Sequence, residues 1–358
     1  MGKMTSRKRL LMAIQHQEAD RVPVAPHISP AMVEQMSDEE WHTFLQHTDI
    51  TLSVGALSDI EIFCGAARKR IRHIERQEDT LKETIRTPKG TLTAERRITR
   101  DASWTTEYLV KTKKDVEKLL SIPYVPPNPE PTAYHEWTER IDKEGLVALA
   151  MPSPFRLALG VLGSQNLYMQ MAEDVGVVEE IVAAFAPRVE DFVERCCEKG
   201  VKSFWMGGSE HCGPGVVHPH TFTQLVTRYD KGIVRLMHDH DALVNYHTHG
   251  KLRAILDDIA EIGIDIMSPI ETGLRGDVTL AEVKEKVGDR ICLKGNLDDM
   301  AFLMIEDEKT IRKAAQRCID AAAEGGGYIL SGTDAGIYRP AWIKAFLVLS
   351  EVAQENPY

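Results

Sequence analysis

The chain has 358 residues, of which 43% are hydrophobic and 27% charged, so it is long enough for one large domain or two smaller ones with an ordinary buried core. Its formal net charge is -11 and no Lys/Arg-rich run stands beside aromatic residues, which argues against nucleic-acid binding. No run of about eighteen uncharged apolar residues occurs, and the basic start lacks an apolar core of signal-peptide length, so we expect a cytoplasmic protein with no membrane segment.

Short apolar runs alternate with longer amphipathic ones along the chain. The runs that have the pattern of buried strands are 22–26, 50–54, 146–150, 202–206, 242–246, 264–267, 291–294 and 328–330. Helical patterns lie between most of them, for example at 174–197, 219–238, 252–262, 280–287 and 309–323. This alternation fits an open doubly wound sheet or a closed barrel, but no glycine-rich phosphate-binding turn follows an early strand. We therefore predict an α/β fold with a single (β/α)8 TIM barrel over residues 1–358.

One segment, from about residue 69 to 110, departs from this rhythm. It is rich in Thr, Arg and Glu with alternating apolar residues, and 87–91 (TPKGT) has the composition of a hairpin turn. We predict an antiparallel β flap inserted after the second strand, serving either as a solvent-facing decoration or as a lid or partner-docking surface. The proline-rich stretch 123–131 then predicts a stiff linker back to the barrel.

The run 245–250 (NYHTHG) stands at the end of the fifth predicted strand. In an extended chain alternate residues lie on one side, so His247 and His249 can share one target. A His-x-His pair also occurs by chance, with both rings serving as ordinary core or surface groups. The pair alone does not decide between these interpretations.

Functional groups of a parallel barrel gather where its strands end. The side chains that follow successive predicted strands are His27; Asp59; Ser153, Phe155 and Arg156; Glu210, His211 and Cys212; His247 and His249; Pro269 and Glu271; Asn296 and Asp298; Thr333 and Asp334. Neighbouring strands lie about 5 Å apart, so Glu210 can meet the two imidazoles around one ion. Two His and one carboxylate suit catalytic zinc, with iron as the alternative.

Several of these neighbours have alternative roles. Glu210, His211 and Cys212 cannot all face one point from an ordinary turn, and of the six cysteines only Cys212 has neighbours that suggest chemistry. Glu271 can pair with Arg275, and Asp334 can cap a helix that begins near Pro340. The cysteines form no paired framework, which suits a reducing compartment without disulfides.

The chain resembles the uroporphyrinogen decarboxylase superfamily over nearly its whole length. The resemblance lies in 7–10 (RKRL), 19–24 (ADRVPV), 87–92 (TPKGTL), Trp104 with Tyr108 and 111–112 (KT), and 293–298 (LKGNLD). It implies a single (β/α)8 barrel and one of two activities, which are cofactor-free decarboxylation of a tetrapyrrole and zinc-dependent methyl transfer to or from a corrinoid.

Departures from the family motifs favour the methyltransferase branch. The decarboxylases carry an Arg-Gln-Ala-Gly-Arg-type motif near the N-terminus, whereas 27–32 here is HISPAM, without arginine. The methyltransferases carry His-x-Cys-Gly and a second Cys near the C-terminus. This chain matches His247 and Gly250, has His249 at the first Cys position and 331–336 (SGTDAG) at the second. Glu210 resembles the family's carboxylate ligand, which implies a zinc site of Glu210, His247 and His249.

A Glu/His/His site leaves zinc more electrophilic than thiolate ligands do, which suits polarising an ether or hydroxyl oxygen. We therefore expect a methoxylated or otherwise methylated small molecule as substrate. The chain has no corrinoid-binding domain, so the resemblance implies cobalamin on a separate corrinoid protein as the methyl acceptor. His27, Arg156 and Glu271 are assigned to substrate binding, and Asp334 to a fourth metal ligand or a proton relay.

Two other classes stay open. A metal-independent lyase of the decarboxylase type would use Asp59 to steady a cationic intermediate. A non-catalytic barrel would only bind a small molecule or a corrinoid partner, and alanine at both histidines of the 245–250 run would leave that binding intact. The oligomeric state also stays open, with a homodimer among the alternatives.

Overall fold

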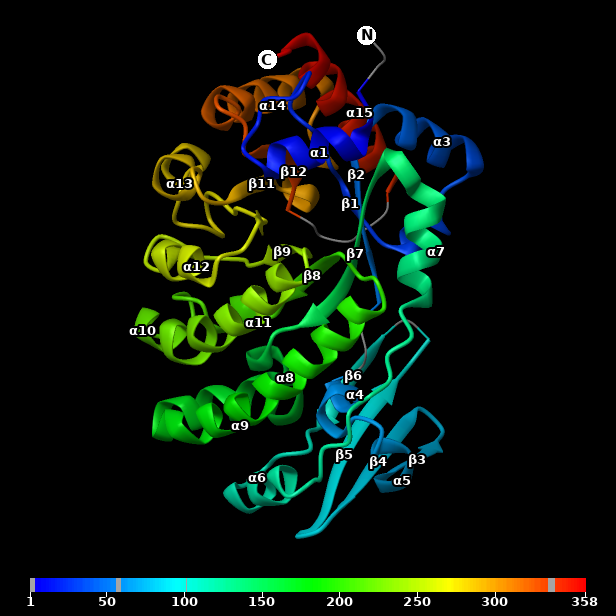
Figure 1. Cartoon of the computed structure of the whole chain (residues 1–358), viewed down its shortest axis with the longest axis vertical. Helices are drawn as coiled ribbons and strands as arrows, with labels where there is room; N and C mark the ends of the chain where they lie inside the picture. Colours follow the sequence, from blue (N-terminus) through cyan, green and yellow to red (C-terminus); the bar gives the residue numbers. More distant parts are fainter. Residues whose placement is uncertain (1–3, 56–58, 101, 334–338) are drawn as a thin grey trace.

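The computed structural model describes residues 4–55, 59–100, 102–333 and 339–358, with the side chains of 59–61 left aside. Eight parallel strands form one sheet, in the order β1-β2-β7-β8-β9-β10-β11-β12 (Figure 1). Their bounds are β1 His27–Ile28, β2 Ile50–Val54, β7 Gly145–Pro152, β8 Ser203–Gly207, β9 Leu243–His247, β10 Ile266–Ser268, β11 Cys292–Leu297 and β12 Tyr328–Gly332. The predicted parallel α/β architecture is confirmed.

The sheet closes on itself just before β1. Val24 bridges Leu330 of β12 in parallel. Ala25 N donates to Leu330 O at 3.0 Å, and Leu330 N donates to Pro23 O at 2.9 Å. The predicted first strand, 22–26, therefore lies in the barrel wall, although regular pairing with β2 begins at His27.

Helices cover the outside of the barrel, as Figure 1 shows. Their bounds are α1 Ser6–Ile14, α2 Pro30–Val33, α3 Asp38–His47, α7 Thr132–Ile141, α8 Pro154–Leu162, α9 Ser164–Glu198, α10 Pro219–Phe222, α11 Arg228–Asp239, α12 Leu256–Ile262, α13 Leu280–Val287, α14 Glu308–Ala322 and α15 Pro340–Glu355. Local signals set several of these ends. Capping boxes start α3 at Ser37 and Glu40, and α13 at Thr279 and Glu282.

Two helices differ from the sequence prediction. The helix predicted over 174–197 begins earlier, at Ser164, and its backbone leaves helical geometry at Asp174. The helix predicted over 252–262 begins only at Leu256, because Asp277 Oδ1 accepts hydrogen bonds from Leu252 N and Arg253 N. A contact from a distant segment thus overrides the local periodicity.

The hydrophobic core lies between the barrel wall and the helices, with side chains alternating between the two sides of each strand. The burial of β7 alternates residue by residue along Gly145–Pro152. At the amino ends of the strands, α1 closes the barrel, since Leu10, Ala13 and Ile14 pack against a small cluster that includes Ile329. The carboxyl ends remain as the mouth where side chains can meet a ligand.

The predicted flap is a four-stranded antiparallel sheet inserted between β2 and β7, with the order β3-β4-β5-β6. Its bounds are β3 Arg72–Gln77, β4 Thr80–Thr87, β5 Gly90–Ile98 and β6 Ser103–Glu107, flanked by α4 Asp59–Cys64, α5 Arg68–Ile71 and α6 Lys113–Leu120. The predicted hairpin joins β4 to β5 through Pro88 and Lys89. The buried cross-strand pair Ile85 and Leu92 anchors the sheet, which projects from the carboxyl side of the barrel (Figure 1). Within the described residues, no helix has the length and apolar composition needed to span a bilayer.

Candidate functional site

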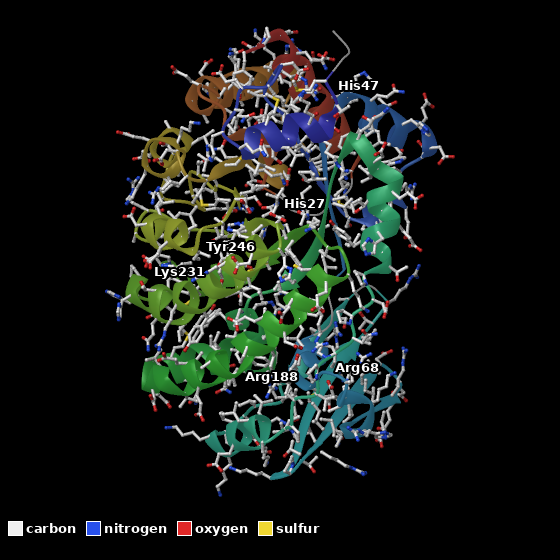
Figure 2. All side chains as sticks on the ribbon, viewed as in Figure 1. His27, His47, Arg68, Arg188, Lys231 and Tyr246 are labelled. Carbon is white, nitrogen blue, oxygen red and sulfur yellow. The ribbon has the colours of Figure 1, made fainter. Side chains whose placement is uncertain are left out.

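Four aromatic rings form a file from the barrel interior to its mouth. The ring of His27 lies 5.6 Å from that of Trp205, which lies 4.6 Å from His247, which in turn lies 4.4 Å from His249. His27 is partly buried and is labelled near the middle of the view in Figure 2, with Nε2 3.0 Å from Ser53 Oγ. His247 is only 7% exposed, whereas the side chain of His249 is 33% exposed. The file therefore runs from His27 and Trp205, which line a cavity inside the barrel, to the partly exposed His249.

His249 is held by a buried carboxylate. Its Nδ1 lies 3.3 Å from Glu271 Oε1, and Glu271 Oε2 accepts a hydrogen bond of 2.8 Å from Gly250 N. Burial is the largest single effect and raises the pKa of Glu271. The hydrogen bonds from His249 and Gly250 and the charges of His249 and Arg275 together outweigh it, so the net pKa lies below the usual value. Glu271 is thus an ionised acceptor that orients the His249 ring.

The alternative role predicted for Glu271, pairing with Arg275, is also present. Arg275 Nη1 lies 3.8 Å from Glu271 Oε1, and its Nε lies 3.6 Å from Asp298 Oδ2. The Arg275 side chain is 55% exposed, so this pair is weaker than the contact with His249. The Glu271 carboxylate therefore contacts both His249 and Arg275.

Glu210 lies in the short turn Ser209–Cys212 that follows β8. Its Oε2 accepts a 2.8 Å hydrogen bond from Gly208 N, and its Oε1 lies 3.5 Å from His211 Nε2. Gly208 has φ +111°, and a Cβ built there would lie 2.1 Å from Cβ of Arg156. Only glycine fits this turn, because Arg156 lies directly over its backbone.

His211 faces the same region as the file of rings. Burial lowers its pKa, Glu210 opposes this, and the charges of Arg156 and His249 lower it further. His211 Nε2 lies 3.5 Å from Glu210, and Arg156 packs on the backbone of the same turn at Gly208. His211 therefore joins Glu210 there, whereas Cys212 turns inward, with Sγ 3.7 Å from Thr221 O.

Burial raises the pKa of the Cys212 thiol far above its usual value, which makes this cysteine unreactive. Glu210 and His211, the sequence neighbours that suggested a chemical role for Cys212, thus point away from its thiol. The other five cysteines are buried thiols as well.

The donor set predicted for a metal fits zinc in chemistry, since one carboxylate and two imidazoles are common zinc ligands. Among the residues that the structure describes, however, no three His, Cys, Asp or Glu side chains are arranged around a common metal position. Glu210 is engaged by the Gly208 N–H and His249 by Glu271. The assignment of Glu210, His247 and His249 as ligands therefore stays a prediction, and it requires side-chain rotation.

Two predicted catalytic residues are not placed. Asp334 lies outside the described residues, and Asp59 begins α4 with a side chain that is likewise outside the description. The proposed roles of these carboxylates remain predictions. Of the residues assigned to substrate binding, His27 lies at the inner end of the file, Arg156 over Gly208 in the turn before Glu210, and Glu271 beside His249.

Sequence reasoning missed Trp205. Its indole lies between His27 and His247, and its buried Nε1 has no hydrogen-bond partner among the described residues. It also lines a cavity of about 20 Å³ inside the barrel, together with Ser53 and Asn245. A volume of this size is enough for about one water molecule, which would satisfy the indole N–H. The alternation of the strand predicted over 202–206 contained the signal, since it places residues 203 and 205 on one side.

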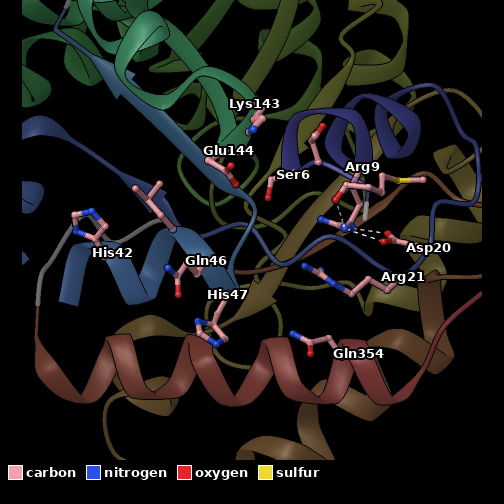
Figure 3. A pocket seen from close by; sticks show the side chains of 13 residues that line it. Ser6, Arg9, Asp20, Arg21, His42, Gln46, His47, Lys143, Glu144 and Gln354 are labelled. Carbon is pink, nitrogen blue, oxygen red and sulfur yellow. Dashed lines mark hydrogen bonds and ion pairs between the residues drawn. The ribbon is translucent and has the colours of Figure 1, made fainter. Parts of the chain in front are cut away.

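Cavity size alone does not locate the site. A cavity of about 820 Å³ lies at the amino side of the barrel, where α1, α3 and α15 meet (Figure 3). Its central guanidinium, Arg9, is bound by Asp20 and Asp49, which gives it a structural role. A second cavity of about 520 Å³ adjoins the mouth and is lined in part by Glu271, Arg275 and Phe302. This one lies beside the titratable cluster.

Comparison with known proteins agrees with this architecture. The profile of the family described as Uroporphyrinogen decarboxylase (URO-D) matches residues 101–339, which is well over half of the chain. A methyltransferase from Methanosarcina mazei has a similar fold, with a TM-score of 0.63, 14% sequence identity and coverage of 98% of this chain and 99% of that one. A B12-independent methionine synthase from Shewanella aligns with a TM-score of 0.47 and 10% identity, over 90% of this chain and 85% of that one. No curated protein gives a significant match in sequence.

Proposed function

The chain belongs to the uroporphyrinogen decarboxylase (URO-D) family, and on this basis we propose that it is a zinc-dependent methyltransferase. The proposed reaction moves a methyl group between a small methoxylated or otherwise methylated molecule and a corrinoid held by a separate protein. The fold shared with the Methanosarcina mazei methyltransferase supports this choice. A fold alone hosts many reactions, so the argument depends on the site.

The observation that carries the proposal is the pair of imidazoles at the barrel mouth. The rings of His247 and His249 lie 4.4 Å apart, and Glu271 fixes His249 through Nδ1. A metal-binding His is commonly held by a carboxylate on its other ring nitrogen, which sets its tautomer and orientation. Glu271 therefore has the position of such a supporting carboxylate.

Glu210, His247 and His249 would hold the zinc, with Glu210 exchanging its bond to Gly208 N for the metal. Zinc bound there would act as a Lewis acid on a substrate oxygen. The residues around it would bind and orient the substrate. Arg156 supplies a positive charge beside His211 for a substrate carboxylate, and the 520 Å³ cavity next to Glu271 offers room for a small molecule.

Metal content is the first test. Purified wild type should contain about one zinc per chain, and the His247→Ala/His249→Ala variant should lose it. A matched control is His238→Ala/His240→Ala, which removes a second His-x-His pair just before β9, at the opposite end of the barrel. Wild type that takes up no metal even when zinc is added would refute the zinc site.

Activity is the second test. Zinc-loaded protein should transfer a methyl group from a methoxylated compound to reduced cobalamin, followed by the change in corrinoid absorbance. Glu210→Gln should lower both metal content and transfer. A Glu210→Gln protein with wild-type metal and full transfer would remove Glu210 from the site.

A metal-independent lyase is the second candidate, because the described side chains do not converge on a metal position. It would work without a corrinoid and without zinc, with Asp59 as its carboxylate. Release of carbon dioxide from a carboxylated pyrrole by chelator-treated protein, and loss of that release in Asp59→Asn, would favour it. Absence of release would leave the methyltransferase as the better account.

A further inference from the structure

A second polar cluster lies behind the mouth, between α11 and β9. The Tyr246 hydroxyl donates a 2.5 Å hydrogen bond to Asp230 Oδ2, and both side chains are fully buried. Figure 2 shows Tyr246 well inside the molecule. Asp230 has no ion pair with any Lys or Arg of the described residues. A fully buried carboxylate with a single hydrogen bond is costly and calls for another partner.

Several buried oxygens in or just before α11, in the turn after β8 and just after β9 lack partners. Asp230 Oδ1, Thr227 Oγ1, Thr248 Oγ1 and Ser209 Oγ are all buried and accept or donate no hydrogen bond among the described residues. Ser209 approaches the Tyr246 hydroxyl closely enough to lower the pKa of that tyrosine, against the larger opposite effects of burial and Asp230. Each unsatisfied buried oxygen costs about 1–3 kcal/mol, so a group that binds all four would relieve a large penalty.

The faces of the two elements give the relative placement of these residues, which is the basis of the inference. Thr248 directly follows β9 and continues its pairing, since its N donates to Ser268 O at 2.7 Å. Tyr246 and Thr248 are alternate residues of this extended segment, so both point toward the helices while His247 points the other way. Thr227 lies one helical turn before Asp230 and therefore on the same face. Since α11 starts at the mouth and β9 ends there, Thr227 and Thr248 lie on the same side of the Asp230–Tyr246 pair. The backbone also departs from α-helical geometry here, as Thr227 ends a π-helical turn that began at Thr223.

The chemistry of the donors selects the ligand. All four are oxygens, which hard cations prefer, and the cluster carries one carboxylate, so a single positive charge gives neutrality. Zinc sites in proteins usually include His nitrogen or Cys sulfur, of which this cluster has none, and calcium or magnesium sites use more carboxylates or water. Burial raises the pKa of Asp230 to about 7, and a bound cation would favour its charged form.

We propose that Asp230, Thr227, Thr248 and Ser209 form a binding site for one alkali-metal cation, Na⁺ or K⁺, between α11 and β9. The ion would tie the end of β9, which carries His247, to the turn that carries Glu210. The site is independent of the proposed methyl transfer, and its occupancy can be measured without any activity.

The experiment is thermal unfolding of the wild-type protein in NaCl, KCl and choline chloride at equal ionic strength. It is run at about pH 8, above the pKa of Asp230, so that the carboxylate is ionised. A bound cation should raise the unfolding temperature saturably, by about 4 °C or more when its concentration far exceeds the dissociation constant. Equal unfolding temperatures in the three salts would show that water fills the cluster, and would overturn the proposal.

Variants locate the effect. Asp230→Asn should abolish the difference in unfolding temperature between the salts. Thr227→Val keeps the shape but removes one oxygen ligand, so at least tenfold more cation should be needed for the same rise in unfolding temperature. Asp239→Asn, on the exposed side of the same helix, should keep the full effect. If Asp230→Asn does not fold, Thr227→Val alone decides, because an unchanged salt response in that variant contradicts the site.

Discussion

Replacing Glu271 with glutamine tests whether this carboxylate positions the mouth histidine. The carboxylate can only accept, so His249 Nδ1 carries the proton in the 3.3 Å contact, and Gly250 N donates the second bond. Glutamine has nearly the same shape but is neutral. Its amide has one acceptor oxygen, whereas the carboxylate has two, one for each of the two donors. One of the two contacts must therefore be lost.

The size of the effect follows from burial and distance. A hydrogen bond to a charged group contributes a net of about 1.5–3 kcal/mol. We expect Glu271→Gln to lower the free energy of unfolding by about 2 kcal/mol in urea titrations at neutral pH. Zinc affinity should fall about 10- to 100-fold, measured by competition with a chelator.

The pH dependence gives a further check. Because the folded-state pKa of Glu271 lies below its usual value, its contribution is present above the unfolded-state pKa and is lost as pH falls through the folded one. The stability difference between wild type and Glu271→Gln should therefore be full at about pH 6 and shrink below about pH 4. Glu282→Gln is the control, since Glu282 also accepts a backbone N–H, but its side chain is 43% exposed and its ion-pair partner is Arg253. Unchanged zinc affinity and unchanged unfolding in Glu271→Gln would refute the positioning role.

Three further substitutions test other parts of the structure. Gly208→Ala places a Cβ 2.1 Å from Arg156 Cβ at a positive φ, so it should destabilise by about 2 kcal/mol or more in urea unfolding; a smaller change would mean that the turn adapts. The hydrogen bond to Asp265 raises the pKa of His238, so their pair stabilises below the unfolded-state pKa and the contribution is lost as pH rises through the folded one. His238→Gln should thus cost under about 1 kcal/mol near pH 5.5, given the 41% exposed ring, and nothing near pH 9. Ile85→Ala should speed hydrogen exchange of the flap amides while barrel amides stay protected, at a cost of about 2–5 kcal/mol to the flap.

Local pattern alone determined much of the framework. The strand predicted over 50–54 and the helix predicted over 280–287 coincide with β2 and α13, and the hairpin predicted at 87–91 joins β4 to β5. These features arise from side-chain periods and turn residues within one short segment, so no distant contact is needed to recognise them. The alternate spacing of His247 and His249 likewise predicted that their rings lie close together, and their centroids are 4.4 Å apart.

Only the tertiary structure decided which distant groups meet. Glu271 has Arg275 four residues away, yet its closer partner is His249. The two residues follow the ends of the paired strands β10 and β9, and this pairing brings them side by side. Asp230 lies on the apolar stripe of α11 with Ile233, Val234 and Met237, at the spacing of one helical face. That spacing predicts burial, but not that Tyr246 would supply the hydrogen bond, because a partner's identity depends on how strand and helix pack. Charge, burial and hydrogen bonding at this site are thus properties of contacts between segments, which no single segment encodes.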